Sequence, residues 1–147
     1  MVRGAIPDIA ITTDIMVGFP GETEDEFEQS YRFCQGMEFA NIHVFPFSPR
    51  PGTVAEAMPG RVEERVKRWR SERMLSLATE AAHRFRERFL GRRAMVLWER
   101  EVEPGVWVGL TDNYIRVFAT SDQDLKNRLD EVRLSGWHDR DLFALAL

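Results

Sequence analysis

The sequence has little cysteine and no long apolar run, and both absences limit what the chain can be. Cys34 is the only cysteine among 147 residues, so the chain has no internal disulfide and no metal site built from cysteines alone. Its apolar stretches are far shorter than the roughly 20 residues that cross a membrane. No apolar signal-peptide core follows Met1, so we expect a cytoplasmic protein without a membrane partner.

Charge is segregated along the chain, although the net charge is only −4. Residues 1–60 hold 3 basic and 9 acidic side chains (net −6), residues 61–93 hold 11 and 5 (net +6), and residues 94–147 hold 6 and 10 (net −4). The basic middle is the only stretch whose charge favours a polyanion. Many of its arginines can equally well solvate the outer face of a helix.

The first 60 residues contain two apolar segments that each run into a turn rich in glycine and proline. Residues 9–17 and 41–45 predict β-strands, because they are rich in β-branched and aromatic side chains. Between them, Thr23 and Glu26 fit a capping box that begins a helix, with Cys34 on its inward stripe. About 28 residues separate the two turns, roughly one strand–helix–strand unit. A right-handed crossover places both strand ends at one sheet edge, where α/β proteins bind ligands.

Each of these turns has two possible roles, as a ligand loop or as a plain turn. The helix after Gly21 offers free backbone N–H groups, as a phosphate site would. Acidic side chains crowd its first turns, however, and favour a zwitterionic or cationic ligand: Glu22, Glu24, Asp25, Glu26 and Glu28. In the second turn, Phe45 and Phe47 flank Pro46 and can meet a flat ring or pack in the core.

One βαβ unit cannot cover both faces of its own sheet, so residues 1–60 predict the last piece of a larger parallel sheet or barrel. Residues 48–53 cannot be helical because they contain Pro49 and Pro51. From Arg61 to about Leu90 the spacing predicts a long amphipathic helix that ends at Gly91. Its apolar side is predicted to carry Val62, Val66, Trp69, Leu77, Ala81, Phe85 and Phe89.

After Gly91 the apolar period changes to two, which predicts an all-β domain. Five short strands in roughly 55 residues favour a small closed or nearly closed β-barrel of the OB type. Trp98 and Trp107 have the spacing of core residues in such strands. The strands are expected at Ala94–Arg100, Val106–Leu110, Tyr114–Ala119, Glu131–Ser135 and Leu142–Leu147.

The amino-acid sequences of two segments resemble those of a known enzyme family. Residues 13–23, Thr-Asp-Ile-Met-Val-Gly-Phe-Pro-Gly-Glu-Thr, and residues 48–55, Ser-Pro-Arg-Pro-Gly-Thr-Val-Ala, are similar to barrel segments of the radical S-adenosylmethionine (SAM) methylthiotransferases. The similarity continues into a C-terminal barrel that resembles a TRAM domain, an OB-like RNA-binding module. The resemblance implies an incomplete radical SAM barrel over residues 1–60, a basic helix closing it over 61–91, and a TRAM domain over 92–147.

Within that family, the resemblance points to the enzymes that modify tRNA. Arg50 lies in a Ser-x-Arg-x-Gly-Thr motif, where the branch acting on a ribosomal protein tends to carry an acidic residue. Residues 43–48 and 109–117 look most like the branch that adds a methylthio group at C2 of N6-threonylcarbamoyladenosine 37 in tRNA. The branch acting on isopentenyladenosine 37 is the alternative.

Complete members of the family bind SAM and two [4Fe-4S] clusters through cysteines that this chain lacks. The resemblance therefore implies a C-terminal fragment that is inactive alone, has the missing N-terminal portion as its partner, and holds no catalytic or metal-binding residue. It implies a rim of the SAM pocket at Gly18, Phe19, Pro20, Gly21, Glu22, Val44, Phe45 and Pro46. It implies tRNA contacts from the barrel, through Arg93, Arg100, Tyr114, Arg116, Lys126, Arg128 and Arg133.

Two further hypotheses compete with the enzyme fragment. The first is a stand-alone RNA-binding module, whose barrel and basic helix work without catalysis. The second is a non-functional remnant that cannot fold its first 60 residues. Because the barrel segment is net acidic, any RNA-binding face on it has to be local.

Overall fold

The computed structural model describes residues 2–146, which form two compact units. One unit comprises residues 11–82, and the other comprises residues 83–146 together with residues 2–10. The long helix α3 (Glu64–Glu87) begins in the first unit and ends in the second. None of the helices between residues 2 and 146 is both long and apolar enough to cross a membrane.

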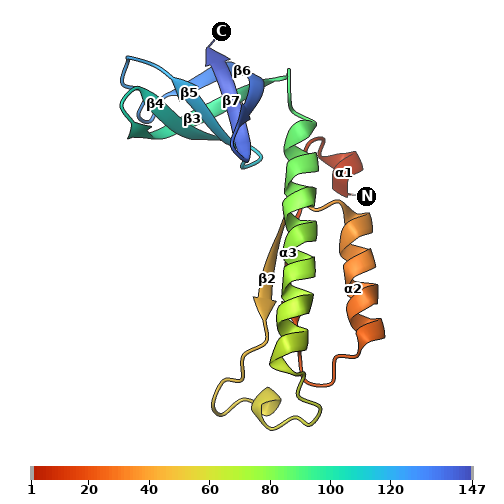
Figure 1. The fold of residues 1–147 in the computed structure, drawn as a ribbon. Coiled ribbons are helices and arrows are strands. Elements are labelled where there is room, and N and C mark those ends of the chain that lie inside the picture. Colours follow the sequence, from red (N-terminus) through yellow and green to blue (C-terminus); the bar gives the residue numbers. More distant parts are fainter. Residues whose placement is uncertain (1, 147) are drawn as a thin grey trace. The chain divides into compact units, whose positions relative to one another are not determined.

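The first unit is built on a βαβ arrangement, drawn with its helices in Figure 1. The parallel strands β1 (Thr12–Val17) and β2 (Asn41–Pro46) are joined by α2 (Glu24–Met37). A short 3₁₀ turn, η1 (Val54–Glu56), precedes α3. The strand–helix–strand prediction is confirmed, but β1 begins three residues later than expected because its pairing with β2 starts only there. One core joins the sheet to both helices: Val17, Phe27, Cys34, Phe39, Ile42, Met74, Leu77 and Ala78.

The start of α2 is encoded in its own first residues. The Thr23 hydroxyl accepts a hydrogen bond from the Glu26 backbone N–H at 3.3 Å, and the Glu26 carboxylate accepts one from the Thr23 backbone N–H at 2.8 Å. This is the predicted capping box. The hydrogen bonds from the Thr23 backbone and side chain hold the pKa of Glu26 below its ordinary value.

The first half of α3 buries a different side from the one that its apolar residues predict. Trp69 is 44% exposed, whereas Lys67 and Arg70 are only 8% and 3% exposed. Trp69 is therefore only partly buried: one part of its ring lies against the core residue Phe27, with ring centroids 5.8 Å apart, while the rest is exposed. The helix also begins and ends three residues inside its predicted limits. Its second half buries the predicted residues Leu77, Ala81 and Phe85.

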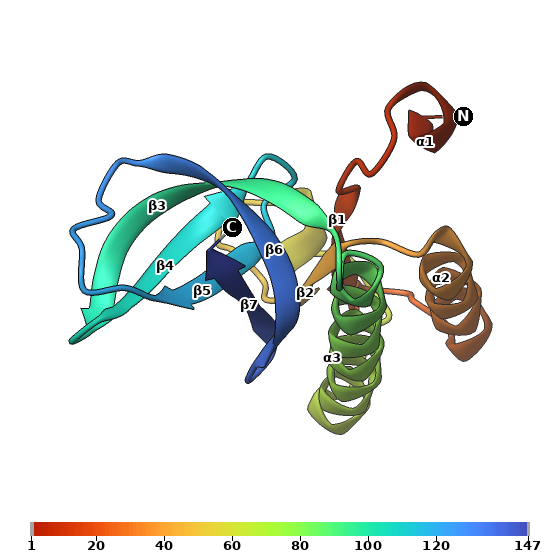
Figure 2. The same cartoon turned by 90° about the horizontal axis from the view of Figure 1, so that it is seen from above.

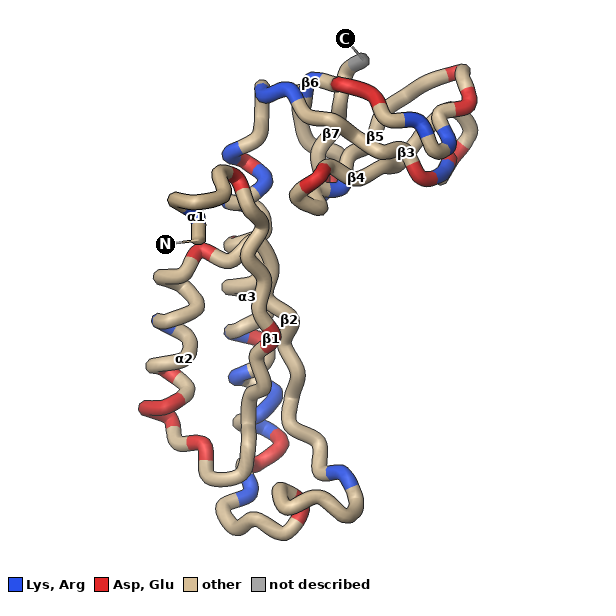
Figure 3. The backbone as a smooth tube through the Cα atoms, turned by 180° about the vertical axis from the view of Figure 1, so that it is seen from behind, with Lys and Arg blue, Asp and Glu red and all other residues tan. Residues whose placement is uncertain are grey.

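Opposite charges on α3 and at the start of α2 face each other across the first unit (Figure 3). The Arg70 guanidinium donates to Glu22 Oε2 at 2.7 Å and to Glu24 Oε2 at 3.3 Å. Arg73 is paired with Glu28, and this hydrogen bond holds the pKa of the Glu28 carboxyl below its ordinary value. The segregated charge of the sequence is thus partly neutralised within the chain.

The turn after β1 is fastened to α3 by two contacts. Gly18 has φ +74°, and a Cβ at this position would overlap the side chain of Lys67. The Gly18 N–H donates to Glu22 Oε2 at 2.6 Å. The same oxygen accepts the hydrogen bond from the Arg70 guanidinium. Lys67 Nζ in turn donates to the carbonyl of Phe47 at 3.3 Å. Both turns at the strand ends are therefore held by side chains of one helix.

The second unit contains a closed five-stranded β-barrel, seen from above in Figure 2. The strand order is β3-β4-β5-β7-β6, and β5 and β7 form the only parallel pair among the described strands of the barrel. A short helix, α1 (Val2–Ala5), belongs to the same unit. The strands are β3 (Arg93–Glu103), β4 (Val106–Thr111), β5 (Arg116–Thr120), β6 (Leu129–His138) and β7 (Asp141–Ala146).

All five predicted strands exist, but their limits differ from the prediction. The strands β3 and β6 are longer than predicted, because they continue through register shifts that bend them around the closed barrel. Tyr114 lies outside β5, in a left-handed turn with φ +62°. Trp98 and Trp107 are buried as predicted, at 2% and 6% exposed. The predicted last strand residue, Leu147, lies outside the described residues.

Replacing Gly18 by alanine is expected to destabilise the first unit by roughly 1–3 kcal/mol, because its positive φ and the side chain of Lys67 both oppose a Cβ. The matched control is Gly36→Ala in α2, where an added Cβ meets nothing within 4 Å. That substitution should stabilise the chain by about 0.5–1 kcal/mol. Urea unfolding followed by circular dichroism measures both, and equal effects would contradict the close approach at Gly18.

Replacing Arg70 by methionine should cost about 3–5 kcal/mol, because it leaves the Glu22 carboxylate, whose side chain is only 13% exposed, without its cation. The control within the same cluster is Glu24→Gln. It breaks a contact whose carboxylate is 54% exposed and should cost less than about 1 kcal/mol. The same unfolding assay compares the two variants. Similar losses of unfolding free energy would contradict a larger contribution of the Arg70–Glu22 contact to stability.

Candidate functional site

The two predicted ligand turns lie side by side at one edge of the β1–β2 sheet. Because the strands are parallel, Val17 at the end of β1 is the register partner of Pro46 at the end of β2. The backbone N–H of Phe47 donates to the carbonyl of Val17 at 2.8 Å. The rings of Phe19 and Phe47 meet edge to face, with centroids 5.2 Å apart. The shared edge that the spacing predicts is therefore present.

A small hollow of about 80 Å³ opens at this edge. Its lining includes two cations, Arg61 and Lys67, and one carboxylate, Glu64, which pairs with Lys67. The acidic residues predicted to crowd the turn contribute less, since Glu22 and Glu24 contact Arg70 instead. The charge at the edge is mixed rather than acidic, which suits a zwitterionic ligand better than a simple cation.

The eight residues predicted for this rim do not all face the same way. Gly18 and Pro20 are buried within the turn, whereas Phe19 is 39% exposed, and Gly21 and Pro46 are exposed. Val44 packs against the core, so its neighbour Phe45 lies on the opposite face and is 51% exposed. Glu22 accepts hydrogen bonds from the Gly18 backbone N–H and from the Arg70 guanidinium, so its carboxylate stabilises the turn.

The sheet face opposite the helices of the first unit carries exposed side chains. Met16 and Phe45 are register partners and are 53% and 51% exposed. The neighbouring pair, Asp14 and His43, is also exposed, and His43 Nε2 lies 3.2 Å from the side-chain nitrogen of Asn41. The sequence signal for this face is the period of two in β1, which sequence reasoning did not use to assign these four residues.

The basic residues predicted to bind RNA are all exposed on the barrel unit, but the structure divides them. Arg93 and Arg133 are register partners on β3 and β6, although they are distant in sequence. Arg93 also contacts Glu131 at 3.4 Å. Arg116 lies at the start of β5, 3.9 Å from Asp141. Sequence order alone did not reveal the pairing of Arg93 with Arg133.

Tyr114 is the most exposed aromatic side chain in the described part of the barrel unit, at 81%. It projects from the turn between β4 and β5, in the left-handed conformation that non-glycine residues adopt at some cost. The preceding residue, Asn113, donates from its side chain to the carbonyl of Asp8 at 3.0 Å. The turn is therefore anchored while its aromatic ring stays free for stacking.

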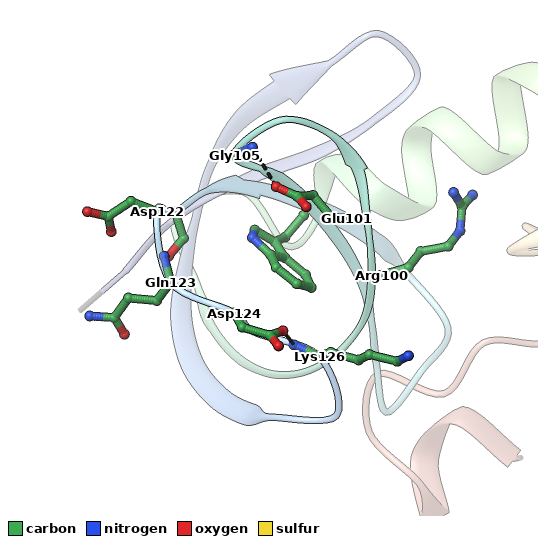
Figure 4. Close-up of a pocket in the computed structure, with 9 residues that line it drawn as sticks. Arg100, Glu101, Gly105, Asp122, Gln123, Asp124 and Lys126 are labelled. Carbon is green, nitrogen blue, oxygen red and sulfur yellow. Dashed lines mark hydrogen bonds between the residues drawn. The ribbon is translucent and has the colours of Figure 1, made fainter.

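Arg100 and Lys126 line an open cavity of about 730 Å³ on the barrel, shown in Figure 4. Trp107 belongs to the same lining. Arg128 lies beside the cavity residues in sequence and contacts Gln123 and Asp130. The predicted RNA-binding residues thus form two sets, one around this cavity and one on the edge strands and the Tyr114 turn.

The chain offers few residues that could hold a metal. Within residues 2–146 no group of three or more histidine, cysteine, aspartate or glutamate side chains is placed to bind one. Cys34 is 1% exposed in the core of the first unit, and burial raises the pKa of its thiol. A buried thiol of this kind acts as a small apolar core residue, as the sequence predicts.

Sequence comparison gives the chain its relatives, although no family model matches it. It is 34% identical over 137 residues to the threonylcarbamoyladenosine tRNA methylthiotransferase MtaB of Bacillus subtilis, covering 90% of this chain and 30% of that protein. The protein of the same name from Thermotoga maritima is 41% identical over 115 residues, or 78% of this chain and 26% of its own length. The tRNA-2-methylthio-N(6)-dimethylallyladenosine synthase of Chloroflexus aurantiacus is 41% identical over 138 residues, which cover 91% of this chain and 29% of that protein.

These relatives agree in the kind of enzyme and differ in the modified base that their names give. The chain spans less than a third of the length of each. The two longer matches cover 90% and 91% of this chain. The expected resemblance is confirmed: over about nine tenths of its length the chain is similar to a segment that makes up about three tenths of these methylthiotransferases.

Proposed function

We propose that this chain is the C-terminal portion of a radical SAM tRNA methylthiotransferase. The observation that carries the proposal is the pair of turns at one sheet edge, in a chain whose relatives are tRNA methylthiotransferases. Such a portion contributes one rim of the SAM pocket and a barrel that binds tRNA. The cytoplasm follows as its compartment, because its substrate is tRNA.

The substrate we propose is N6-threonylcarbamoyladenosine 37 of tRNA. Two observations support it. The sequences of residues 43–48 and 109–117 look most like the branch that acts on this base, and two of the relatives carry its name. Isopentenyladenosine 37 is the second candidate. The relative from Chloroflexus aurantiacus, named as a dimethylallyladenosine synthase, is 41% identical, as is the Thermotoga maritima protein, and it covers 91% of this chain rather than 78%.

The residues of the sheet edge fit part of a SAM site. The backbone N–H groups of Gly18, Gly21 and Glu22 have partners within the chain, so the turn would bound the pocket by its shape, and Phe45 offers an exposed aromatic face. The mixed charge of the hollow beside Lys67 suits the zwitterionic end of SAM. When bound beside a reduced cluster, SAM supplies an adenosyl radical. The single buried cysteine does not fit a cluster, so we place the ligands of both [4Fe-4S] clusters in the rest of the enzyme.

The exposed sheet face is the proposed contact with that missing N-terminal portion. A two-stranded parallel sheet is stable only when both of its faces are covered, and helices cover one face here. Met16 and Phe45 would then lie inside a larger barrel. This also explains why the chain alone is expected to be inactive: it holds one wall of a site whose cluster lies elsewhere.

We propose that the β-barrel is a TRAM domain of the OB type. Its strand order, numbered within the barrel, is 1-2-3-5-4 with the last strand returning to the first, and strands 3 and 5 are parallel. OB barrels bind single-stranded nucleic acids with basic and aromatic side chains. The exposed Tyr114 and the cross-strand pair of Arg93 and Arg133 supply both kinds. A stand-alone RNA-binding module remains the alternative that uses the same surface.

The test is tRNA binding by the full chain at several salt concentrations. Arg116→Ala and Arg133→Ala should each weaken binding and lower the slope of log affinity against log salt by about 1, since each removes one phosphate contact. Arg32→Ala, an exposed arginine of α2, is the matched control and should leave binding unchanged. Binding that is equal in all three variants would contradict the barrel surface.

A further inference from the structure

The turn between β4 and β5 presents Tyr114 to solvent at a cost in stability. Its φ of +62° lies in the left-handed region, which a bulky residue adopts only with strain. Burial does not compensate for this strain, because the side chain is 81% exposed. A glycine would adopt the same backbone conformation freely. An aromatic side chain that is both strained and exposed therefore points to a ligand.

Hydrogen bonds fasten the turn on both sides of Tyr114. The Thr111 hydroxyl donates to Asn113 Oδ1 at 2.6 Å and accepts the backbone N–H of Ile115 at 2.9 Å. The Tyr114 N–H donates to the carbonyl of Thr111 at 3.0 Å. Thr111 and Ile115 are themselves buried, at 7% and 2% exposed. The backbone that carries the exposed ring is thus attached to the core of the barrel.

Tyr114 borders a hollow of about 220 Å³ on the barrel unit. Residues 6–10 form much of its lining, and their side chains are apolar apart from Asp8. The Asn113 side chain donates to the carbonyl of Asp8 at 3.0 Å, which joins this segment to the turn. The hollow is smaller than the roughly 300 Å³ at which pockets for drug-sized ligands begin. It therefore suits one flat ring, and an aromatic side chain beside apolar walls suits the face of a nucleobase.

Two arginines lie together beside this hollow, because they share the carboxylate of Asp8. Arg92 Nη1 lies 3.0 Å from one of its oxygens, and Arg88 Nη2 lies 3.6 Å from the other. The two guanidinium groups also lie 5.2 Å and 6.0 Å from the ring centre of Phe89. Both side chains are about half exposed and each guanidinium has five N–H donors, so they can bind a further anion.

The charge around Asp8 suits a single phosphate group. One carboxylate shared by Arg88 and Arg92 leaves a net charge of +1, which matches one phosphodiester. The other carboxylate of the lining, Asp112, is exposed, so solvent and salt screen it. An aromatic platform and a pair of cations therefore lie within one part of the barrel unit.

We propose that this hollow is a subsite for one unpaired RNA base, which stacks on the ring of Tyr114. A phosphate of the same strand lies at Arg88 and Arg92. A base within a duplex cannot enter, because its neighbours already cover both of its faces. The inference rests on the proposed RNA binding by the barrel unit and adds to it the place and the kind of one contact. It also gives a reason for the strained backbone of Tyr114.

Two substitutions at position 114 separate the ring from the backbone strain. Tyr114→Gly removes both, so it should weaken binding of a short single-stranded RNA about 5- to 150-fold without lowering the midpoint of urea unfolding. Tyr114→Phe should restore most of the lost affinity, because it keeps the ring. The matched control is Phe33→Ala, which removes an exposed ring of α2 and should bind RNA normally. Fluorescence anisotropy of labelled RNA measures all three.

The arginine pair has its own test in the same assay. Arg92→Ala should weaken binding and lower the slope of log affinity against log salt by about 1, because it removes one phosphate contact. An unchanged slope would contradict the placement of a phosphate at this pair.

NMR of the full chain with ¹³C-labelled tyrosine rings observes the stacking directly. The chain has two tyrosines, and the signals absent from Tyr114→Phe belong to Tyr114. A single-stranded RNA should move these signals upfield, because the ring current of a stacked base shields the protons over its face. Tyr31 in α2 is the internal control and should not move. A duplex of the same sequence should leave both sets of signals in place.

The outcomes separate this inference from the function on which it rests. If RNA binds with a steep salt dependence, but Tyr114→Gly binds normally and the Tyr114 signals stay in place, the subsite is wrong and RNA binding stands. Equal shifts with duplex RNA would contradict an unpaired base. A smaller size of Tyr114→Gly in size-exclusion chromatography would assign the ring to a contact between two copies of the chain and overturn the subsite. If the chain binds no RNA at all, the proposed function itself fails.

Discussion

The contact between Arg70 and Glu22 is the interaction on which the first unit depends. One carboxylate oxygen accepts both the Gly18 backbone N–H and the Arg70 guanidinium, which joins the turn after β1 to the middle of α3. The guanidinium is almost fully buried, so the pair holds its geometry without competition from water. Lys67 fills the space over Gly18 and reaches the end of β2. These contacts hold together the edge where both strands end.

The same arrangement explains how acidic and basic segments coexist in one chain. The acidic start of α2 complements its helix dipole and also meets the cations of α3, so its charge is neutralised locally. What remains at the strand ends is a hollow of mixed charge beside aromatic rings. A net count of charges over the sequence cannot show this, because it does not say which charges face each other.

In the barrel unit, closure of the sheet rather than pairing of charges brings distant residues together. Register shifts bend β3 and β6 until they pair with each other, which brings Arg93 next to Arg133. The closed barrel buries Trp98 and Trp107, at 2% and 6% exposed, but of the two only Trp107 lines the cavity, and its indole N–H is buried without an acceptor among the described residues. Two tryptophans with the same strand spacing thus have different surroundings.

Local patterns in the sequence determined the elements, because each depends on near neighbours. The capping box at Thr23, the strands with period two and the turns rich in glycine and proline were all predictable, and so was the family. Tertiary structure alone decided that Arg70 is buried and Trp69 exposed, and that Trp107 lines a cavity. These outcomes depend on partners distant in sequence: a carboxylate for the guanidinium, and a closed barrel for the indole. No single segment contains that information.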